Sequence, residues 1–225
     1  MPTESAARTE VLRRIRAALG QPTPAAEAVK AEWESIPRTY RRSSSLSREA
    51  VIEMLEDRLR DYDAHVEQVP AAGVADAIGR LLAARGVRRM VIPQGLSEAL
   101  AADFQQRLPE AFEFVDDDGL SSDAINQFDG VLTTSQVAIA ATGTLVLQDV
   151  PGQGRRAPTL IPDYHLCLVR LDDIVETVPE AMALLGDTAT LATTFISGPS
   201  ATADIEMTRI KGVHGPRFLD VILVQ

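Results

Sequence analysis

The feature that most constrains the fold is an alternation of short apolar runs with amphipathic stretches along residues 47–225. The apolar runs have the length and continuity of buried strands, and the stretches between them repeat their apolar residues at helical spacing. Continuous apolar strands separated by helices are typical of a mostly parallel sheet that is covered on both faces. We therefore predict an α/β fold with a mixed, mostly parallel sheet.

Eight strands and six helices follow from this pattern. The strands are expected at 64–69, 89–93, 112–115, 130–134, 144–150, 166–171, 193–196 and 221–224. The helices are expected from Ser5 to Gly20, from Ser47, at 74–85, at 96–107, from Asp172 to Leu185 and near 201–211. Because 130–134 and 144–150 follow each other closely, they suggest that the sheet is mixed. Residues 1–45 are interpreted as an N-terminal helix with a linker arm, and residues 46–225 as the main domain.

Composition excludes several classes of protein. The net charge is −10, which disfavours a general binder of the phosphate backbone of nucleic acids. Cys167 is the only cysteine, so an iron–sulfur cluster or a structural zinc ion within this chain is not expected. The thiol lies in an apolar run and is interpreted as buried, with a reactive thiol as the alternative.

No run of about 20 apolar residues, the length that crosses a bilayer, is present in the sequence. The N-terminal stretch is charged and lacks the apolar core of a signal peptide. We therefore expect a cytoplasmic protein.

The first candidate binding segment spans residues 133–144. Thr133 and Thr134 end one predicted strand, and Thr142, Gly143 and Thr144 begin the next. In open α/β sheets ligands bind beyond the carboxyl ends of the strands. These residues are candidates for binding an oxygen-rich ligand; the alternative is a β-turn whose hydroxyls cap backbone groups.

The second candidate segment spans residues 197–206, between a predicted strand and a predicted helix. Ser200 is a plausible N-cap, and the free N–H groups of a helix start attract anions. Gly198 and Thr202 are further candidate ligand-binding residues in this segment. Asp204 and Glu206 are candidate catalytic carboxylates, or they satisfy the helix dipole internally.

The third candidate segment spans residues 211–217. His214 lies between Gly212 and Gly215, and the conformational freedom of glycine favours an irregular loop here. His214 is a candidate for proton transfer near neutral pH, although a lone histidine is more often structural. Lys211 and Arg217 are candidate cations for a carboxylate.

The loop at 151–158 carries two arginines and could close over an anionic ligand, or it is a solvated loop. The acidic run at 116–118 lacks the spacing of an EF-hand, so no metal site is expected there.

Four segments in this order carry a resemblance to a known family: 138–144, 160–165, 197–206 and 212–216. Together they resemble the LUD domain family, most closely its lactate-utilisation members. The resemblance covers residues 47–225 and is strongest from residue 130 onward. It implies a three-layer αβα sandwich similar to the sugar-phosphate isomerase and CoA-transferase superfamily.

The resemblance also implies a role in oxidising L-lactate to pyruvate. Partners similar to lactate-utilisation proteins A and B would carry the iron–sulfur clusters, and this chain would be a subunit without a redox centre. A small hydroxy- or keto-acid is the expected ligand. The family usually has Glu where this chain has Ala141, so a carboxylate at that position is not available here.

Two other functions stay open. The chain could be a stand-alone enzyme that acts on a phosphorylated sugar or a CoA-type substrate, by analogy of fold alone. It could also be a non-catalytic assembly or regulatory module that docks through the residues before Ser47.

Overall fold

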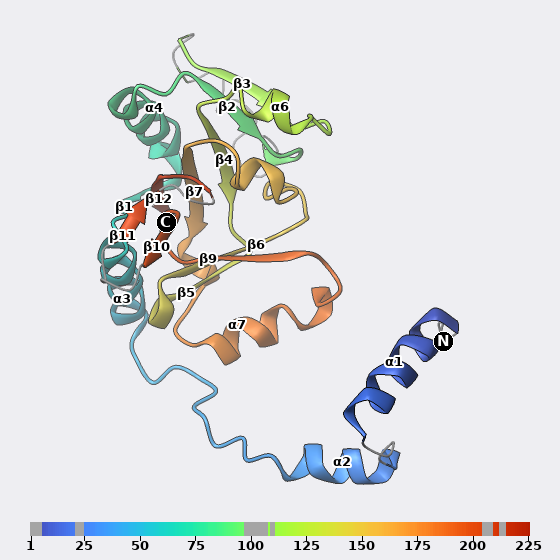
Figure 1. Ribbon diagram of the computed structural model, residues 1–225. Coiled ribbons are helices and arrows are strands. Elements are labelled where there is room, and N and C mark those ends of the chain that lie inside the picture. Colours follow the sequence, from blue (N-terminus) through green and yellow to red (C-terminus); the bar gives the residue numbers. More distant parts are fainter. Residues whose placement is uncertain (1–5, 21–24, 97–107, 109–110, 204–208, 212–214) are drawn as a thin grey trace. The chain divides into compact units, whose positions relative to one another are not determined.

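The computed structural model describes residues 6–20, 25–96, 108, 111–203, 209–211 and 215–225 (Figure 1). Contacts between Cα atoms divide the chain into two compact units, Met1–Tyr40 and Arg41–Gln225. The sequence analysis places the corresponding boundary after residue 45. No helix in the described ranges is both long and apolar enough to cross a membrane.

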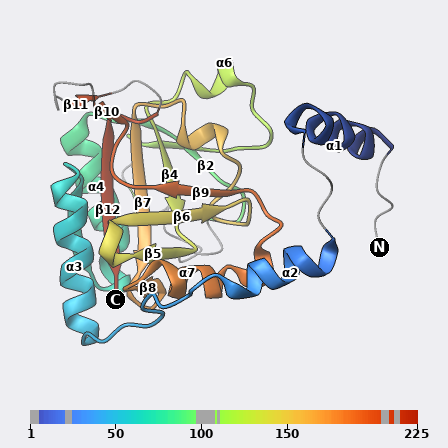
Figure 2. The ribbon, with the colours of Figure 1, turned by 60° about the horizontal axis from the view of Figure 1, so that its bottom comes forward.

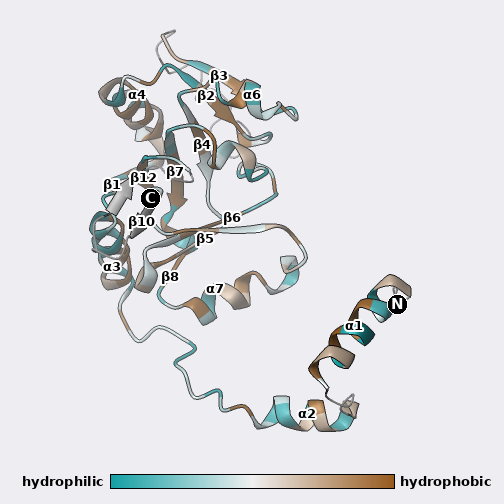
Figure 3. Cartoon of the chain, in the orientation of Figure 1, coloured by the Kyte–Doolittle hydropathy of each residue, from teal (hydrophilic) through white to brown (hydrophobic). Residues whose placement is uncertain are grey.

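The described residues of the first unit form the helices α1 (Ala6–Leu19) and α2 (Ala26–Ser35). The first agrees with the helix expected up to Gly20. The second lies in the part that was interpreted as linker, where Ala, Glu and Lys favour a helix despite the prolines on either side. Neither helix buries a residue, within the part of the chain that is described. Figure 3 shows that α1 carries both hydrophobic and hydrophilic residues along its length.

The second unit is built on a six-stranded sheet in which all neighbouring strands are parallel. In spatial order its strands are β1 (His65–Val69), β12 (Phe218–Val224), β7 (Tyr164–Arg170), β4 (Gly130–Thr134), β2 (Arg89–Ile92) and β3 (Glu113–Asp116). The helices formed by the described residues of this unit are α3 (Arg48–Asp61), α4 (Val74–Arg85), α6 (Ser122–Ile125) and α7 (Val178–Leu184). Short 3-10 helices are η1 (Ala71–Gly73), η2 (Ala140–Thr142), η3 (Ala157–Thr159), η4 (Leu171–Asp173) and η5 (Gly186–Thr188).

A second sheet has the order β8 (Ile174–Val175), β5 (Val137–Ile139), β6 (Thr144–Gln148) and β9 (Thr193–Ile196). β6 pairs with β5 and β9 in antiparallel fashion, and β8 joins β5 in parallel. The two strands that suggested one mixed sheet, 130–134 and 144–148, therefore lie in different sheets. The tight turn through η2, with Gly143 at a φ of 58°, folds β6 back on β5 and away from β4.

The core lies on both faces of the parallel sheet. α4 packs on one face, where it meets Leu166 and Leu168 of β7. α3 and the second sheet pack on the other face, where they meet Cys167 and Val169 of the same strand. Figure 2 shows β6 and β9 crossing the direction of β7 and β12. Helices on both faces of a parallel sheet confirm the predicted α/β class.

Two predicted helices are corrected by the structure. Residues 172–177 contain η4 and β8, and α7 begins only at Val178, because Thr177 and Glu180 form a capping box there. The helix expected near 201–211 is wrong: β10 (Ala201–Ala203) pairs antiparallel with β11 (Arg209–Lys211). The helix expected at 96–107 lies almost entirely outside the described residues.

The segment from Arg41 to Ser45 is anchored on two carboxylates near the start of α7. Glu176, whose side chain is 2% exposed, pairs with Arg41 and accepts a hydrogen bond from Ser44 Oγ at 2.6 Å. Glu180 accepts one from the Ser44 backbone N–H at 2.9 Å. The pKa of the Glu176 carboxyl is lowered by these bonds, with Ser44 the largest cause and Arg41 a further one. The carboxylate therefore stays charged and holds the segment.

A substitution at Gly130 tests how closely β4 approaches β7. A β-carbon at this position would lie 2.8 Å from the Tyr164 ring and 3.0 Å from the Tyr164 carbonyl oxygen. We expect Gly130→Ala to lower the free energy of unfolding by about 1–3 kcal/mol, the usual cost of overpacking. Urea denaturation measures it. In the control Gly186→Ala the new β-carbon meets no atom within 4 Å, so a loss as large as that of Gly130→Ala would contradict the packing argument.

A substitution of Glu176 tests whether this carboxylate anchors residues 41–45. Hydrogen bonds to a charged group contribute about 1.5–3 kcal/mol, so Glu176→Ala should speed trypsin cleavage after Arg41 and Arg42 by about tenfold or more. The digestion is followed by mass spectrometry under native conditions. Asp172→Ala removes a carboxylate that is 86% exposed and serves as the control. Equal cleavage rates in the two variants would show that Glu176 does not hold the segment.

Candidate functional site

One cavity, of about 350 Å³, collects several of the predicted residues. Gly198, Ser200 and Gly215 line it, together with β9, η3 and the first residues of β7 and β12. We call it the His165 cavity, after the most deeply buried polar side chain in its lining. It lies near the amino ends of β7 and β12, and not beyond the carboxyl ends of strands, where the sequence analysis looked. The cavity forms at this end because β9, the edge strand of the second sheet, lines one side of it.

His165 is 1% exposed and lines the cavity from β7. Its Nε2 atom and the Thr133 hydroxyl are 2.8 Å apart. Burial lowers the pKa of His165 to about 4, because a charged ring would lose its hydration. The imidazole is therefore neutral at pH 7.

The predicted candidate Thr133 connects His165 to the single cysteine. Its hydroxyl also lies 3.7 Å from Cys167 Sγ, as a donor. Cys167 is fully buried, and burial raises the pKa of its thiol to about 12. The thiol is thus uncharged and enclosed, which confirms the prediction of a buried cysteine.

The hydroxyls of the first segment are joined to the edge of the cavity. Thr142 Oγ1 and Thr144 Oγ1 are 2.7 Å apart, and Thr144 Oγ1 lies 2.8 Å from Ser197 Oγ. Gly143 and Gly198 have positive φ angles, and a β-carbon on either would collide with α3 or its C-cap residue, at Arg58 and Tyr62 respectively. These two glycines therefore serve the close approach of the turns to that helix.

The second and third segments are joined by a backbone hydrogen bond. The Ser200 N–H donates to the Pro216 carbonyl oxygen at 2.8 Å. Because a strand follows Ser200, this residue is not a helix N-cap, and the argument from a helix dipole does not apply. Thr202 and Lys211 belong to the β10–β11 hairpin. Four further candidates lie outside the described residues: Asp204, Glu206, Gly212 and His214.

Thr134 and Arg217 are also absent from the cavity lining. Thr134 Oγ1 donates to the Gly152 carbonyl oxygen at the carboxyl end of β4. Arg217 is exposed and forms an ion pair with Asp163. Ala141 is exposed in η2 and is not part of the cavity lining.

The loop at 151–158 supplies two arginines with different roles. Arg155 makes two hydrogen bonds of 2.7 Å to Asp117, so the carboxylate in the middle of the acidic run at 116–118 is already paired. Arg156 is exposed, lines the His165 cavity, and forms no ion pair with any described residue. It also lines an adjoining hollow of about 250 Å³.

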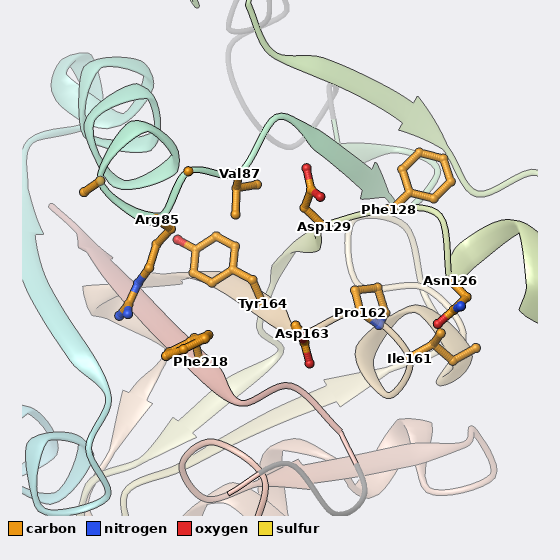
Figure 4. Close-up of a pocket in the computed structure, with 12 residues that line it drawn as sticks. Arg85, Val87, Asn126, Phe128, Asp129, Ile161, Pro162, Asp163, Tyr164 and Phe218 are labelled. Carbon is orange, nitrogen blue, oxygen red and sulfur yellow. The ribbon is translucent and has the colours of Figure 1, made fainter.

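Two larger hollows hold cations that are already neutralised. One, of about 640 Å³, lies at the carboxyl ends of β2 and β3 and contains Arg155 with its partner Asp117. The other, of about 580 Å³, is shown in Figure 4 and lies at the amino ends of the strands. There Arg85 lies 2.5 Å from the buried carboxylate of Asp220, which also accepts from the Tyr164 hydroxyl at 3.0 Å.

The sequence analysis did not select His165, Arg156 or Thr159, although all three line the cavity. A signal existed for two of them. His165 ends one of the four segments that carry the resemblance, and Arg156 lies in the loop that was considered for anions. Among the described residues, no group of three or more His, Cys, Asp or Glu side chains is placed to hold a metal ion.

The comparisons with known proteins agree with this architecture. The LUD domain family matches residues 52–224, and this chain belongs to that family. Over its whole length the chain is 37% identical to a protein named Lactate utilization protein C from Deinococcus radiodurans, of which it covers 98%. A protein of the same name from Bacillus subtilis is 26% identical over 95% of this chain and 94% of its own.

A solved structure is similar as well. It is the crystal structure of a DUF162 family protein from Deinococcus radiodurans, with a TM-score of 0.67 and 37% identity. The match covers 80% of this chain and 99% of that one.

The neutral state of His165 has a measurable consequence for stability. In the unfolded chain the ring is protonated below a pKa of about 6.5, whereas in the folded protein it is protonated only below about 4. The unfolded state therefore binds the extra proton between these values, and stability falls as the pH drops. We expect His165 to account for a loss of up to about 3 kcal/mol between pH 7 and pH 4.

Urea denaturation of the wild type and of His165→Gln at several pH values isolates this contribution. Glutamine keeps a polar atom near Thr133 but does not titrate. The difference between the two proteins in free energy of unfolding should shrink as the pH falls. A difference that stays constant from pH 7 to pH 4 would contradict a buried, neutral ring.

Proposed function

We propose that this chain is a cytoplasmic component of an L-lactate oxidation system, in which it works as a subunit without a redox centre. The observation that supports this most directly is the full-length similarity, at 37% identity, to a protein named Lactate utilization protein C. The similarity spans both units of the chain and nearly all of the relative. It therefore concerns a whole protein and not a domain shared among unrelated ones.

In this proposal, partner proteins accept the electrons that the reaction releases. Oxidation of L-lactate to pyruvate releases two electrons and two protons. Iron–sulfur clusters that accept electrons are held by several cysteine thiolates, and this chain has only Cys167. The Cys167 thiol is enclosed and its pKa is raised to about 12. We therefore assign the clusters to partners similar to lactate-utilisation proteins A and B.

Deletion of the gene tests the proposal. The deletion strain should fail to grow on L-lactate and should grow normally on pyruvate, because the block lies before pyruvate. A plasmid copy of the wild-type gene should restore growth. Normal growth of the deletion strain on L-lactate, in the absence of a second copy of such a gene, would contradict the role.

A biochemical arm separates a direct role from an indirect one. The tagged chain should co-purify with the products of neighbouring genes, and L-lactate oxidation by those gene products, purified without this chain, should depend on adding it back. Full oxidation by the partners alone would show that the chain is dispensable for the reaction.

A further inference from the structure

The His165 ring, which lines the cavity, has one nitrogen that no described residue hydrogen-bonds. The Nε2 atom of His165 is occupied by Thr133, while no described residue hydrogen-bonds the Nδ1 atom. Since His165 lines the cavity, a molecule in the cavity is the partner that Nδ1 can gain.

The ring can offer either a donor or an acceptor at Nδ1. A neutral imidazole has one protonated and one unprotonated nitrogen. When the Thr133 hydroxyl donates to Cys167 Sγ, Nε2–H donates to Thr133, and Nδ1 accepts. When Thr133 donates to Nε2 instead, Nδ1–H donates. The first state suits a ligand hydroxyl and the second a ligand carbonyl, so one site accommodates both.

Arg156 supplies the positive charge at the same cavity. Its guanidinium has no ionic partner among the described residues, unlike Arg155 and Arg85, which are held by Asp117 and Asp220. A guanidinium pairs with a carboxylate through two parallel hydrogen bonds. The cavity lining thus includes a cation without an ionic partner and a ring nitrogen without a hydrogen-bond partner among the described residues.

Apolar side chains complete the lining. Leu219, which is 1% exposed, comes from β12, Ile196 comes from β9, and Pro199 and Pro216 flank them. They leave an apolar surface for a short hydrocarbon group. Gly215, which has no side chain, lets the lining approach the ligand closely.

From these contacts we infer that the His165 cavity binds a small 2-hydroxy- or 2-oxocarboxylate. Its carboxylate pairs with Arg156, its oxygen on the second carbon bonds Nδ1 of His165, and its short alkyl group lies on the apolar lining. The choice of this acid class rests on the proposed function, whose substrate and product differ by the hydroxyl and the carbonyl that the imidazole accommodates.

The test is calorimetric titration of the purified full chain at pH 7 with sodium L-lactate, sodium pyruvate and sodium propionate. Propionate has the carboxylate and the alkyl group but no oxygen on the second carbon. Lactate and pyruvate should bind about tenfold more tightly than propionate, the effect of one hydrogen bond in a buried site. Equal affinity for the three acids would show that His165 does not bind the ligand.

Matched variants separate the two polar groups. Arg156→Ala should weaken binding of all three acids by about tenfold or more, whereas Arg217→Ala, an exposed arginine outside the cavity lining, should leave it unchanged. His165→Gln retains an atom at the Nε2 position and should reduce lactate and pyruvate to the affinity of propionate. His165→Asn retains an atom near Nδ1 and should preserve the preference. Circular dichroism verifies that each variant is folded.

The outcomes keep this inference separate from the proposed function. If no acid binds at millimolar concentration, or if Arg156→Ala and Arg217→Ala behave alike, the site is wrong, even if the deletion strain fails on L-lactate. If the acids bind as expected but the deletion strain grows normally on L-lactate, the site stands and the role in lactate oxidation falls.

Discussion

The rest of this structure depends on the burial of β7 on both faces. Leu166 and Leu168 meet α4, and Cys167 and Val169 meet the layer made by α3 and the second sheet. A strand enclosed in this way excludes water from both sides, so a polar side chain on it must find its partners within the protein. His165 is such a side chain. Its bond to Thr133 in the neighbouring strand satisfies one nitrogen, and the cavity provides room for a partner to the other.

The sequence predicted those elements whose pattern is local. The helix at 74–85 and the strands at 130–134 and 193–196 have the bounds that were expected, since their apolar spacing and flanking breakers decide them. β10 and β11 were missed because each is only three residues long and is defined by its antiparallel pairing with the other, and not by a periodic spacing of its own apolar residues. The start of α7 was misplaced because Asp172 resembled a cap, while the reciprocal Thr177–Glu180 bonds define the real one.

The candidate site shows the same division between local and non-local information. The glycines and hydroxyl-bearing residues selected near predicted strand ends include Gly198, Ser200 and Gly215, which line one cavity. The hydroxyls of Thr142 and Thr144 reach that cavity only through Ser197. His165 was not selected because it directly precedes the apolar run expected as a strand at 166–171, where a polar residue is common. Its importance arises from the placement of β9, which no spacing within residues 160–165 reveals.

The uncharged state of the His165 ring also determines how an acid anion would experience the site. Because burial keeps the pKa of His165 near 4, the ring has the same charge throughout the range from weakly acidic to weakly basic solution. Arginine keeps its proton over this range as well. The His165 ring therefore offers a ligand the same uncharged hydrogen-bonding group across physiological acidity.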